Sequence, residues 1–206
     1  VPNYYGPQRF GINGNNLHHG KDFVLKGRQS RRKLTKTESF WLSAIRSWCF
    51  NEALSDQVEN GMWMRLCDGD IAQFQHKDEQ FRVKEVGALM HLSVLRGGIS
   101  PVLPMISEGW EAGTGAQREQ VMKASLSDST DLVDALIAFD LSRDSRLARL
   151  VPMNMAWELL NDSEGNTQLI VEFSLTKGCF ATSILREMID FTDKSAEKFH
   201  ENIDRE

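Results

Sequence analysis

The stretch Thr35-Lys36-Thr37-Glu38-Ser39-Phe40-Trp41-Leu42-Ser43-Ala44-Ile45-Arg46-Ser47-Trp48-Cys49-Phe50 contains the strongest structural signal in the chain. Thr35 and Glu38 have the spacing of a capping box, in which two side chains satisfy backbone N–H groups of the first helical turn. From Leu42 onwards, apolar residues recur at helical spacing and extend onto the neighbouring faces. A helix that is apolar on most sides is typically buried. We therefore predict a buried central helix that begins here.

The residues on either side of this helix predict a mixture of loops, helices and short strands. Residues 1–36 show no sustained period and indicate an ordered loop with short helical pieces. Asp68-Gly69 is a turn signal between two apolar runs, so we expect a hairpin over residues 62–74. The other expected elements are a strand at 81–83, a helix over 85–96, an extended edge or loop with two prolines over 99–105, and helices over 117–126 and 131–150.

Residues 151–206 differ in kind from the rest. Two apolar runs of strand type, 156–160 and 168–175, flank a polar segment and predict an antiparallel pair, and a helix is expected over 181–191. An isolated ribbon of two strands is marginally stable in water, and the sequence of residues 1–150 offers no partner strands for it. Together these patterns predict an α+β fold in which the last two strands belong to a larger sheet.

Composition excludes several classes of protein. The chain is 41% hydrophobic and 26% charged, which is ordinary for a folded domain and excludes disordered and fibrous proteins. It has no apolar run of the length that a membrane span needs. Three widely spaced cysteines without a CxxC pair exclude a disulfide framework and favour the reducing cytoplasm. The five histidines form no metal-binding motif, so we expect no metal site.

Positive charge is concentrated at the beginning of the chain. Residues 1–36 carry eight basic side chains and one acid, whereas the remainder carries 16 basic and 28 acidic residues. Such a concentrated segment indicates a local site for a polyanion such as RNA, and the alternative is a plain solvated surface. The candidate contacts with an RNA backbone are Arg9, Arg28, Arg31, Arg32 and Lys33.

Two further features each have two interpretations. Arg143, Arg146 and Arg149 recur near the expected end of the 131–150 helix, where they either oppose the helix dipole favourably or contact RNA. Phe180 follows the last expected strand and precedes the last expected helix. At such a turn a side chain either faces a ligand or belongs to the core.

Distinctive motifs occur at both ends of the chain and between them. They are Val1-Pro2-Asn3-Tyr4-Tyr5-Gly6-Pro7-Gln8-Arg9-Phe10-Gly11 with Gly14-Asn15-Asn16-Leu17, then Ser39-Phe40-Trp41-Leu42-Ser43-Ala44 with Arg46-Ser47 and Phe50-Asn51, Asp68-Gly69-Asp70, Gln117-Arg118-Glu119, and Gly178-Cys179-Phe180-Ala181-Thr182-Ser183 with Arg186-Glu187. In this order they resemble the motifs of TruD-type tRNA pseudouridine synthases. The resemblance covers nearly the whole chain.

This resemblance implies an enzyme that isomerises uridine to pseudouridine at position thirteen of tRNA, without a cofactor or metal. Members of the family use an aspartate to break the bond between base and sugar, and the target nucleotide is extruded for this chemistry. By resemblance, residues 1–150 form the family-specific inserted domain and residues 151–206 are a segment of the catalytic domain. Phe180 matches a phenylalanine that lines the uridine pocket, and Arg186 is a further candidate for substrate binding.

The chain departs from the family pattern in one respect. The catalytic aspartate of the family stands in a Gly-x-Lys-Asp context upstream of the Pro-Asn-Tyr motif, and this chain begins at that motif. We therefore expect a piece of a longer protein, with no catalytic residue of its own and no activity alone. Two alternatives remain open, namely a non-catalytic RNA-binding module and a protein unrelated to RNA.

Overall fold

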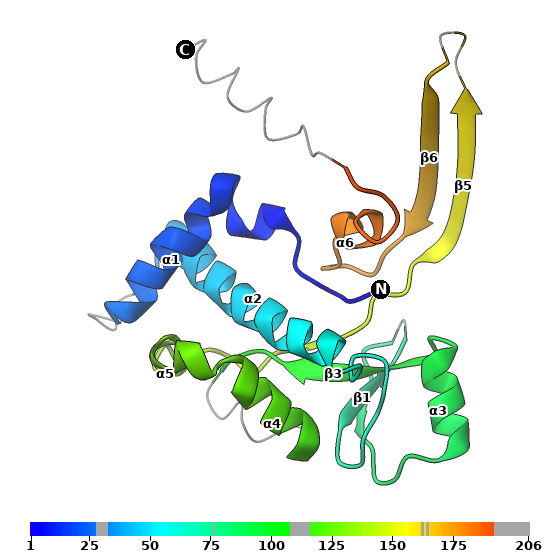
Figure 1. Cartoon of the computed structure of the whole chain (residues 1–206). Coiled ribbons are helices and arrows are strands. Elements are labelled where there is room, and N and C mark those ends of the chain that lie inside the picture. Colours follow the sequence, from blue (N-terminus) through cyan, green and yellow to red (C-terminus); the bar gives the residue numbers. More distant parts are fainter. Residues whose placement is uncertain (28–32, 76, 108–115, 162, 164, 192–206) are drawn as a thin grey trace, which may run out of the picture.

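The computed structural model describes residues 1–27, 33–75, 77–107, 116–161, 163 and 165–191. It contains α-helices and two antiparallel sheets, which agrees with the predicted α+β class (Figure 1). The elements are the 3-10 turns Pro7–Phe10, Ile12–Gly14 and Ser127–Ser129, helices α1 (Asn15–Leu25), α2 (Lys36–Glu59), α3 (Ala88–Leu95), α4 (Ala116–Ser125), α5 (Thr130–Ile137) and α6 (Ala181–Leu185), and strands β1 (Ile71–Phe74), β2 (Gln80–Arg82), β3 (Ile99–Pro104), β4 (Ser145–Leu147), β5 (Met153–Asn161) and β6 (Thr167–Ser174).

Helix α2 is the centre of the larger hydrophobic core, as predicted. Thr35 is its N-cap, and the capping box is formed: Thr35 Oγ1 accepts a hydrogen bond from the Glu38 amide at 3.2 Å, and Glu38 Oε2 accepts one from the Thr35 amide at 2.8 Å. Apolar side chains of α2 pack with those of α1, α4 and α5. Among the described helices, none is long and apolar enough to cross a membrane.

Helix α1 is more regular than the sequence predicted, because the 11 residues Asn15–Leu25 form one α-helix in a segment expected to be mainly loop. The close approach of Gly20 to α2 explains how α1 is held in place. A Cβ atom added at Gly20 would lie 2.8 Å from the Trp41 carbonyl oxygen and 2.8 Å from Ile45 Cγ1, so α1 lies directly against α2. Packing on α2, rather than a strong pattern of its own, stabilises this helix.

The first sheet has four antiparallel strands in the order β2-β1-β3-β4, and it corrects two expectations. The expected hairpin over residues 62–74 is wrong: a turn is present at Asp68-Gly69, but β1 pairs with β2 and β3 instead. The segment expected at an edge is the inner strand β3. Its first half pairs with β1 and its second half with β4, so Pro101 lies where the pairing partner changes.

The helix expected over residues 131–150 is also wrong in its second half. Helix α5 ends at Ile137, Asp140 adopts a left-handed conformation with φ of 54°, and Ser145–Leu147 form strand β4. Arg143, Arg146 and Arg149 therefore do not lie at a helix end, and the dipole interpretation does not apply to them. From strand β4, Arg146 instead makes the tertiary contacts described below.

Strands β5 and β6 form the predicted antiparallel pair, as a separate two-stranded ribbon. Figure 1 shows this ribbon projecting away from the helices, with α6 close to the beginning of the chain. Large apolar side chains of the ribbon are exposed, Trp157 by 66% and Leu159 by 55%. The last helix is shorter than predicted, since α6 ends at Leu185.

Candidate functional site

The opening segment of the chain is attached to two different elements. The Asn3 amide donates to the Ala148 carbonyl at 3.0 Å, and its side-chain Nδ2 donates to the Leu147 carbonyl at 2.9 Å. Two residues later, the Tyr5 amide donates to Asn51 Oδ1 at 2.9 Å, and Asn51 Nδ2 donates back to the Tyr5 carbonyl at 3.1 Å. These bonds fix the segment between the end of β4 and helix α2.

The motif at the other end of the chain meets this segment. Ser183 Oγ donates a hydrogen bond of 2.9 Å to the Tyr4 carbonyl. The ring of Phe180 packs edge-on against the ring of Tyr5, with 5.8 Å between centroids and 63° between planes. Phe180 is the N-cap residue of α6 and is half-buried. Residues that the sequence places far apart thus form one site.

Arg146 of β4 lies at the centre of this meeting point. Its guanidinium donates to Asn3 Oδ1 at 2.7 Å, to the Asn3 carbonyl at 3.1 Å and to the Gly178 carbonyl at 2.7 Å. The guanidinium carbon lies 4.1 Å from the Tyr5 centroid and 5.9 Å from that of Phe180, which are cation–π distances. Burial lowers the pKa of Arg146, and Tyr5 opposes that shift. The side chain holds β4, the opening segment and the closing motif together.

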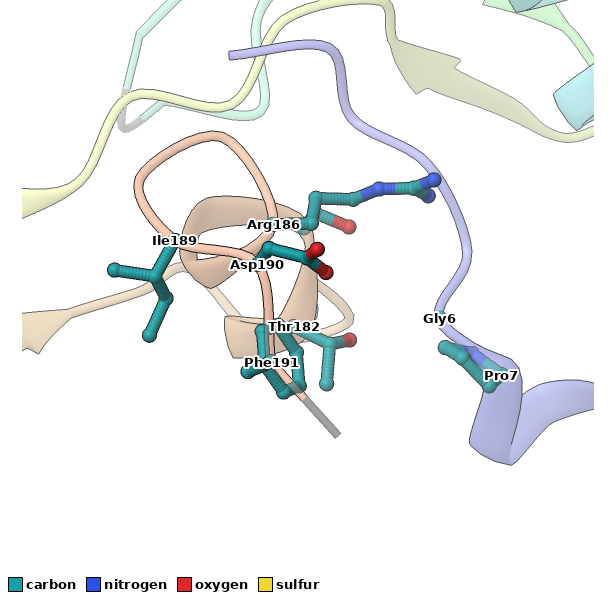
Figure 2. A pocket seen from close by; sticks show the side chains of 8 residues that line it. Gly6, Pro7, Thr182, Arg186, Ile189, Asp190 and Phe191 are labelled. Atoms are coloured by element: carbon teal, nitrogen blue, oxygen red, sulfur yellow. The ribbon is translucent and has the colours of Figure 1, made fainter. Parts of the chain in front are cut away.

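Beside this cluster lie two cavities that residues of the closing motif line. The larger cavity, of about 510 Å³, lies between the opening segment and α6. In Figure 2 the guanidinium of Arg186 extends towards the part of the opening segment that precedes Gly6. Arg186 is exposed, and its guanidinium carbon lies 5.7 Å from the Tyr4 centroid. This larger cavity is lined by Gly6, Pro7, Thr182, Ser183, Arg186, Ile189, Asp190 and Phe191.

The smaller cavity, of about 310 Å³, is lined by Gln8, Arg9, Asn16, Phe40 and Phe180. Phe40 is 52% exposed. Arg9 is half-buried, and its Nη1 donates to Ser43 Oγ at 3.1 Å. This cavity therefore combines aromatic rings, amide groups and a cation that α2 holds in place.

The structure brings together some of the candidate residues and leaves others apart. Arg9 and Phe180 line the smaller cavity, whereas Arg186 lines the larger one. Lys33 lines neither of the two. The other three candidates for RNA-backbone contacts, Arg28, Arg31 and Arg32, lie outside the described residues.

Sequence reasoning gave no role to Asn3 and Tyr5, and it did not predict the role of Arg146. The first two lie within the opening motif, so the aromatic and amide residues of that motif were the available signal. The spacing of Arg146 with Arg143 and Arg149 drew attention to it, but its role in joining the two motifs was not predicted, because its partners come from distant parts of the chain.

The rings and arginines of the cluster are suited to bind a ligand, and Asp190 adds a carboxylate to the larger cavity. Aromatic rings and arginines suit stacked bases and phosphates. Burial raises the pKa of the Cys179 thiol, with Arg146 opposing the shift, so this thiol is not an activated nucleophile. Among the described residues, no group of three or more His, Cys, Asp or Glu side chains is arranged to hold a metal ion.

Comparisons with known proteins agree with the motifs. Residues 30–188 match the family model described as tRNA pseudouridine synthase D (TruD). The chain is 32% identical over 210 residues to tRNA pseudouridine synthase D of Photobacterium profundum, covering 100% of this chain and 55% of that protein. It is 36% identical over 190 residues to the protein of the same name from Aeromonas hydrophila, covering 92% of this chain and 51% of that protein.

A solved structure shares the fold. The crystal structure assigned to tRNA pseudouridine synthase D (TruD) from Methanosarcina mazei aligns with a TM-score of 0.64 at 17% identity, covering 91% of this chain and 60% of the other. In sequence, the chain spans about half the length of the curated relatives that it matches.

Proposed function

Because this chain belongs to the TruD family of tRNA pseudouridine synthases, we propose that it acts as part of an enzyme that isomerises uridine to pseudouridine at position thirteen of tRNA. The observation that carries this proposal is the contact of Phe180 with Tyr5, 5.8 Å between centroids, which joins the opening and closing motifs beside two cavities. A ring at this place offers an apolar surface to an extruded uracil.

The roles of the described residues in this reaction follow from their positions. Phe180 holds the extruded base, and Arg186 binds a phosphate or the catalytic carboxylate from the side of the larger cavity. Arg146 is a positioning residue, because it holds the backbone at Gly178 and the ring of Tyr5 and touches neither cavity. By its likeness to the family, the aspartate that breaks the bond between base and sugar comes from outside this chain.

The division of the chain is part of the same proposal. We infer an inserted domain over residues 1–150 and a segment of the catalytic domain over 151–206. The β5–β6 ribbon supports this division, since a two-stranded ribbon with exposed Trp157 and Leu159 is suited to join a larger sheet. The additional strands of that sheet would bury those side chains and would bring the catalytic aspartate close to Phe180.

Binding of the RNA backbone is assigned to the basic residues of the first 36. Arg9 lies beside Phe180 in the smaller cavity, which supports its role. For Arg28, Arg31, Arg32 and Lys33 the support is their charge. Each lost phosphate contact lowers the log–log salt slope of binding by nearly one unit on a duplex. Arg31→Glu with Arg32→Glu should therefore weaken tRNA binding and flatten its salt dependence, and an unchanged slope would assign both residues to plain surface.

The experiment that tests the function uses a chimera in which this chain replaces the matching part of the Photobacterium profundum protein. Carbodiimide mapping of tRNA treated with the chimera should reveal pseudouridine at position thirteen. A chimera that folds and binds tRNA yet modifies another position would reject the assigned specificity. If the wild-type chain binds no tRNA at low salt, this result would favour the alternative of a protein unrelated to RNA.

A further inference from the structure

We propose that a separate cavity on the four-stranded sheet, here named the sheet cavity, binds an unpaired guanine base of the tRNA. The sheet cavity has a volume of about 430 Å³, and Gln80, Arg143, Asp144 and Ser145 line it above an apolar floor. It shares none of its described lining residues with the two cavities that the closing motif lines. The choice of tRNA as the source of the base rests on the proposed function, whereas the choice of guanine rests on the cavity itself.

The floor of the sheet cavity is one face of the sheet. Pro104 of β3 pairs with Ser145 of β4, and Val102 lies two residues before Pro104 on the same face. Ile71 of β1 completes the floor. The residue between Val102 and Pro104 is Leu103, which points the other way and is fully buried in the larger core. The sheet cavity therefore lies on the face away from that core, and its apolar floor suits one face of a planar base.

The amide of Gln80 is fixed beside this floor by hydrogen bonds to two other strands. Its Nε2 donates to Ser145 Oγ at 2.9 Å and to Gln73 Oε1 at 3.1 Å. Gln73 Nε2 donates in turn to the Lys77 carbonyl at 2.6 Å. Both N–H groups of the Gln80 amide are therefore engaged. Gln80 Oε1 is left to accept a hydrogen bond from a ligand, and the Ser145 hydroxyl is left to donate one.

Arg143 and Asp144 add one charge of each sign to the sheet cavity, and both side chains are exposed. Asp144 Oδ1 accepts a hydrogen bond of 2.8 Å from the Ser145 amide, which orients the carboxylate. An ionised carboxylate accepts hydrogen bonds and donates none. It repels a phosphate group and attracts a ligand that offers N–H groups. The sheet cavity therefore suits the edge of a base better than the backbone of a nucleic acid.

Guanine is the base whose edges match these groups. Its Watson–Crick edge carries N–H donors on two adjacent positions, N1 and N2, which the two oxygens of a carboxylate can accept together. Adenine, cytosine and uracil each have such a donor at a single position. The O6 and N7 atoms of guanine are acceptors, and arginine is their commonest partner in nucleic-acid complexes. Asp144 therefore selects guanine, and Arg143 and the Ser145 hydroxyl suit its O6 atom.

Shared lining residues connect the sheet cavity with the closing motif. Asp144 also lines a cavity of about 250 Å³ whose lining includes Tyr5 and Arg9. Arg9 in turn lines the cavity that contains Phe180. An RNA strand that follows this line from the sheet cavity passes the cation of Arg9 before it reaches Phe180. This arrangement favours a nucleotide of the bound tRNA over a free nucleotide.

The test measures tRNA binding by this chain after removal of one negative charge. On a plain surface, the loss of a carboxylate reduces repulsion of a polyanion, so binding should tighten or stay the same. Loss of a carboxylate that reads a base should instead weaken binding. We expect Asp144→Asn to raise the Kd for tRNA by about 5-fold to 150-fold, which corresponds to about 1–3 kcal/mol for a bidentate base contact. The asparagine keeps an oxygen for the Ser145 amide, so the local fold should be preserved.

Asp78→Asn is the matched control. Asp78 is an exposed carboxylate in the turn between β1 and β2, and it does not line the sheet cavity. Because this substitution removes the same charge from the same sheet, it should bind tRNA at least as tightly as wild type. Opposite directions of the Asp144 and Asp78 effects support the guanine site.

A second measurement identifies the base without a folded tRNA. The wild-type chain should bind the heptamer UUUGUUU about 5-fold to 150-fold more tightly than UUUAUUU. Inosine in place of guanine lacks the N2 amino group, so the inosine heptamer should bind with intermediate affinity. Asp144→Asn should lose the preference for guanine.

The outcomes separate this inference from the proposed function. If the wild-type chain binds tRNA and Asp144→Asn binds it as tightly as Asp78→Asn, the guanine site is rejected while the proposed function stands. Equal affinity of the wild-type chain for the guanine and adenine heptamers rejects the guanine site as well. If the wild-type chain binds no tRNA but prefers the guanine heptamer, the proposed function fails and the sheet cavity keeps its assignment to guanine.

Discussion

The guanidinium carbon of Arg146 lies 4.1 Å from the centroid of the Tyr5 ring, and the same guanidinium donates a 2.7 Å hydrogen bond to the carbonyl of Gly178. One side chain from β4 thereby joins the opening and closing motifs of the chain. A planar guanidinium suits this role, because it stacks on a ring with its face while its edge donates several hydrogen bonds. The site depends on this contact for its shape.

We expect Arg146→Met to lower the free energy of unfolding by about 2–4 kcal/mol, because Asn3 Oδ1 and the Gly178 carbonyl lose their charged donor. Arg146→Lys should lose nearly as much, since an ammonium cannot stack and fork in the same way. Urea unfolding measures both. Arg143→Met is the control, because Arg143 is exposed and its replacement should change stability by less than about 0.5 kcal/mol. Equal stability of the Arg146 and Arg143 variants would refute the joining role.

The buried ion pair between Arg118 and Asp70 should be highly sensitive to substitution. Its atoms are 2.7 Å apart with both side chains fully buried, and Arg118 also donates to Gln57 and to the Arg65 carbonyl. Removing one member leaves an uncompensated buried charge, so Asp70→Ala should lower the free energy of unfolding by about 3–5 kcal/mol. Thermal or urea unfolding beside the exposed control Asp78→Ala checks this. A loss below about 1 kcal/mol would show that water reaches the pair.

Stability at alkaline pH should decrease because of Cys49. Burial raises the pKa of this thiol from 9.0 to about 12. Above pH 9 the thiol loses its proton in the unfolded chain and keeps it in the folded chain. The contribution of this thiol to the free energy of unfolding therefore falls by about 1.4 kcal/mol per pH unit until the pKa of the folded state is reached. The difference in pH slope of unfolding between wild type and Cys49→Ala, measured above pH 9, isolates this effect. Parallel slopes for the two proteins would contradict a buried, protonated thiol.

Phe180 should affect binding and stability to different degrees. Phe180→Ala should weaken tRNA binding by this chain, and turnover by the chimera, about 5-fold to 150-fold, because stacking is worth about 1–3 kcal/mol per base. Phe180→Tyr and Phe180→Leu should lose less, since they keep much of the apolar surface. A ring that served only the core would instead cost about 3–5 kcal/mol of stability. If Phe180→Ala binds tRNA normally but has a much lower melting temperature, Phe180 serves only the core.

The accuracy of the sequence predictions depended on how local the determining contacts are. The N-terminus of α2 was predictable because its capping box lies within four residues, and the β5–β6 pair because a short polar turn connects two apolar runs. The hairpin over residues 62–74 and the second half of the 131–150 helix were wrong. There, side chains bond across the fold: Asp70 with Arg118, and Arg146 with Asn3 and Gly178.

The site shows the same limit. Phe180 was predicted to bind substrate because its motif resembles that of the family. The sequence suggested no role for the ring of Tyr5, which lies beside Phe180. The assignment of Phe40 to a cavity required the tertiary structure, since only there does α2 approach the closing motif. A local pattern identifies motifs, whereas packing determines which of their residues share a site.

Release of tritium from tRNA labelled at carbon 5 of uridine is the most direct test of the central claim, that this chain supplies the binding half of a pseudouridine synthase. Carbon 5 must lose its hydrogen for the base to rejoin the sugar through that carbon. The account predicts no release by this chain alone, and release by the chimera that adds the upstream half of the Photobacterium profundum protein. Release by the chain alone would contradict the account, because one of its own carboxylates would then be catalytic. A folded chimera that binds tRNA without releasing tritium would contradict it equally.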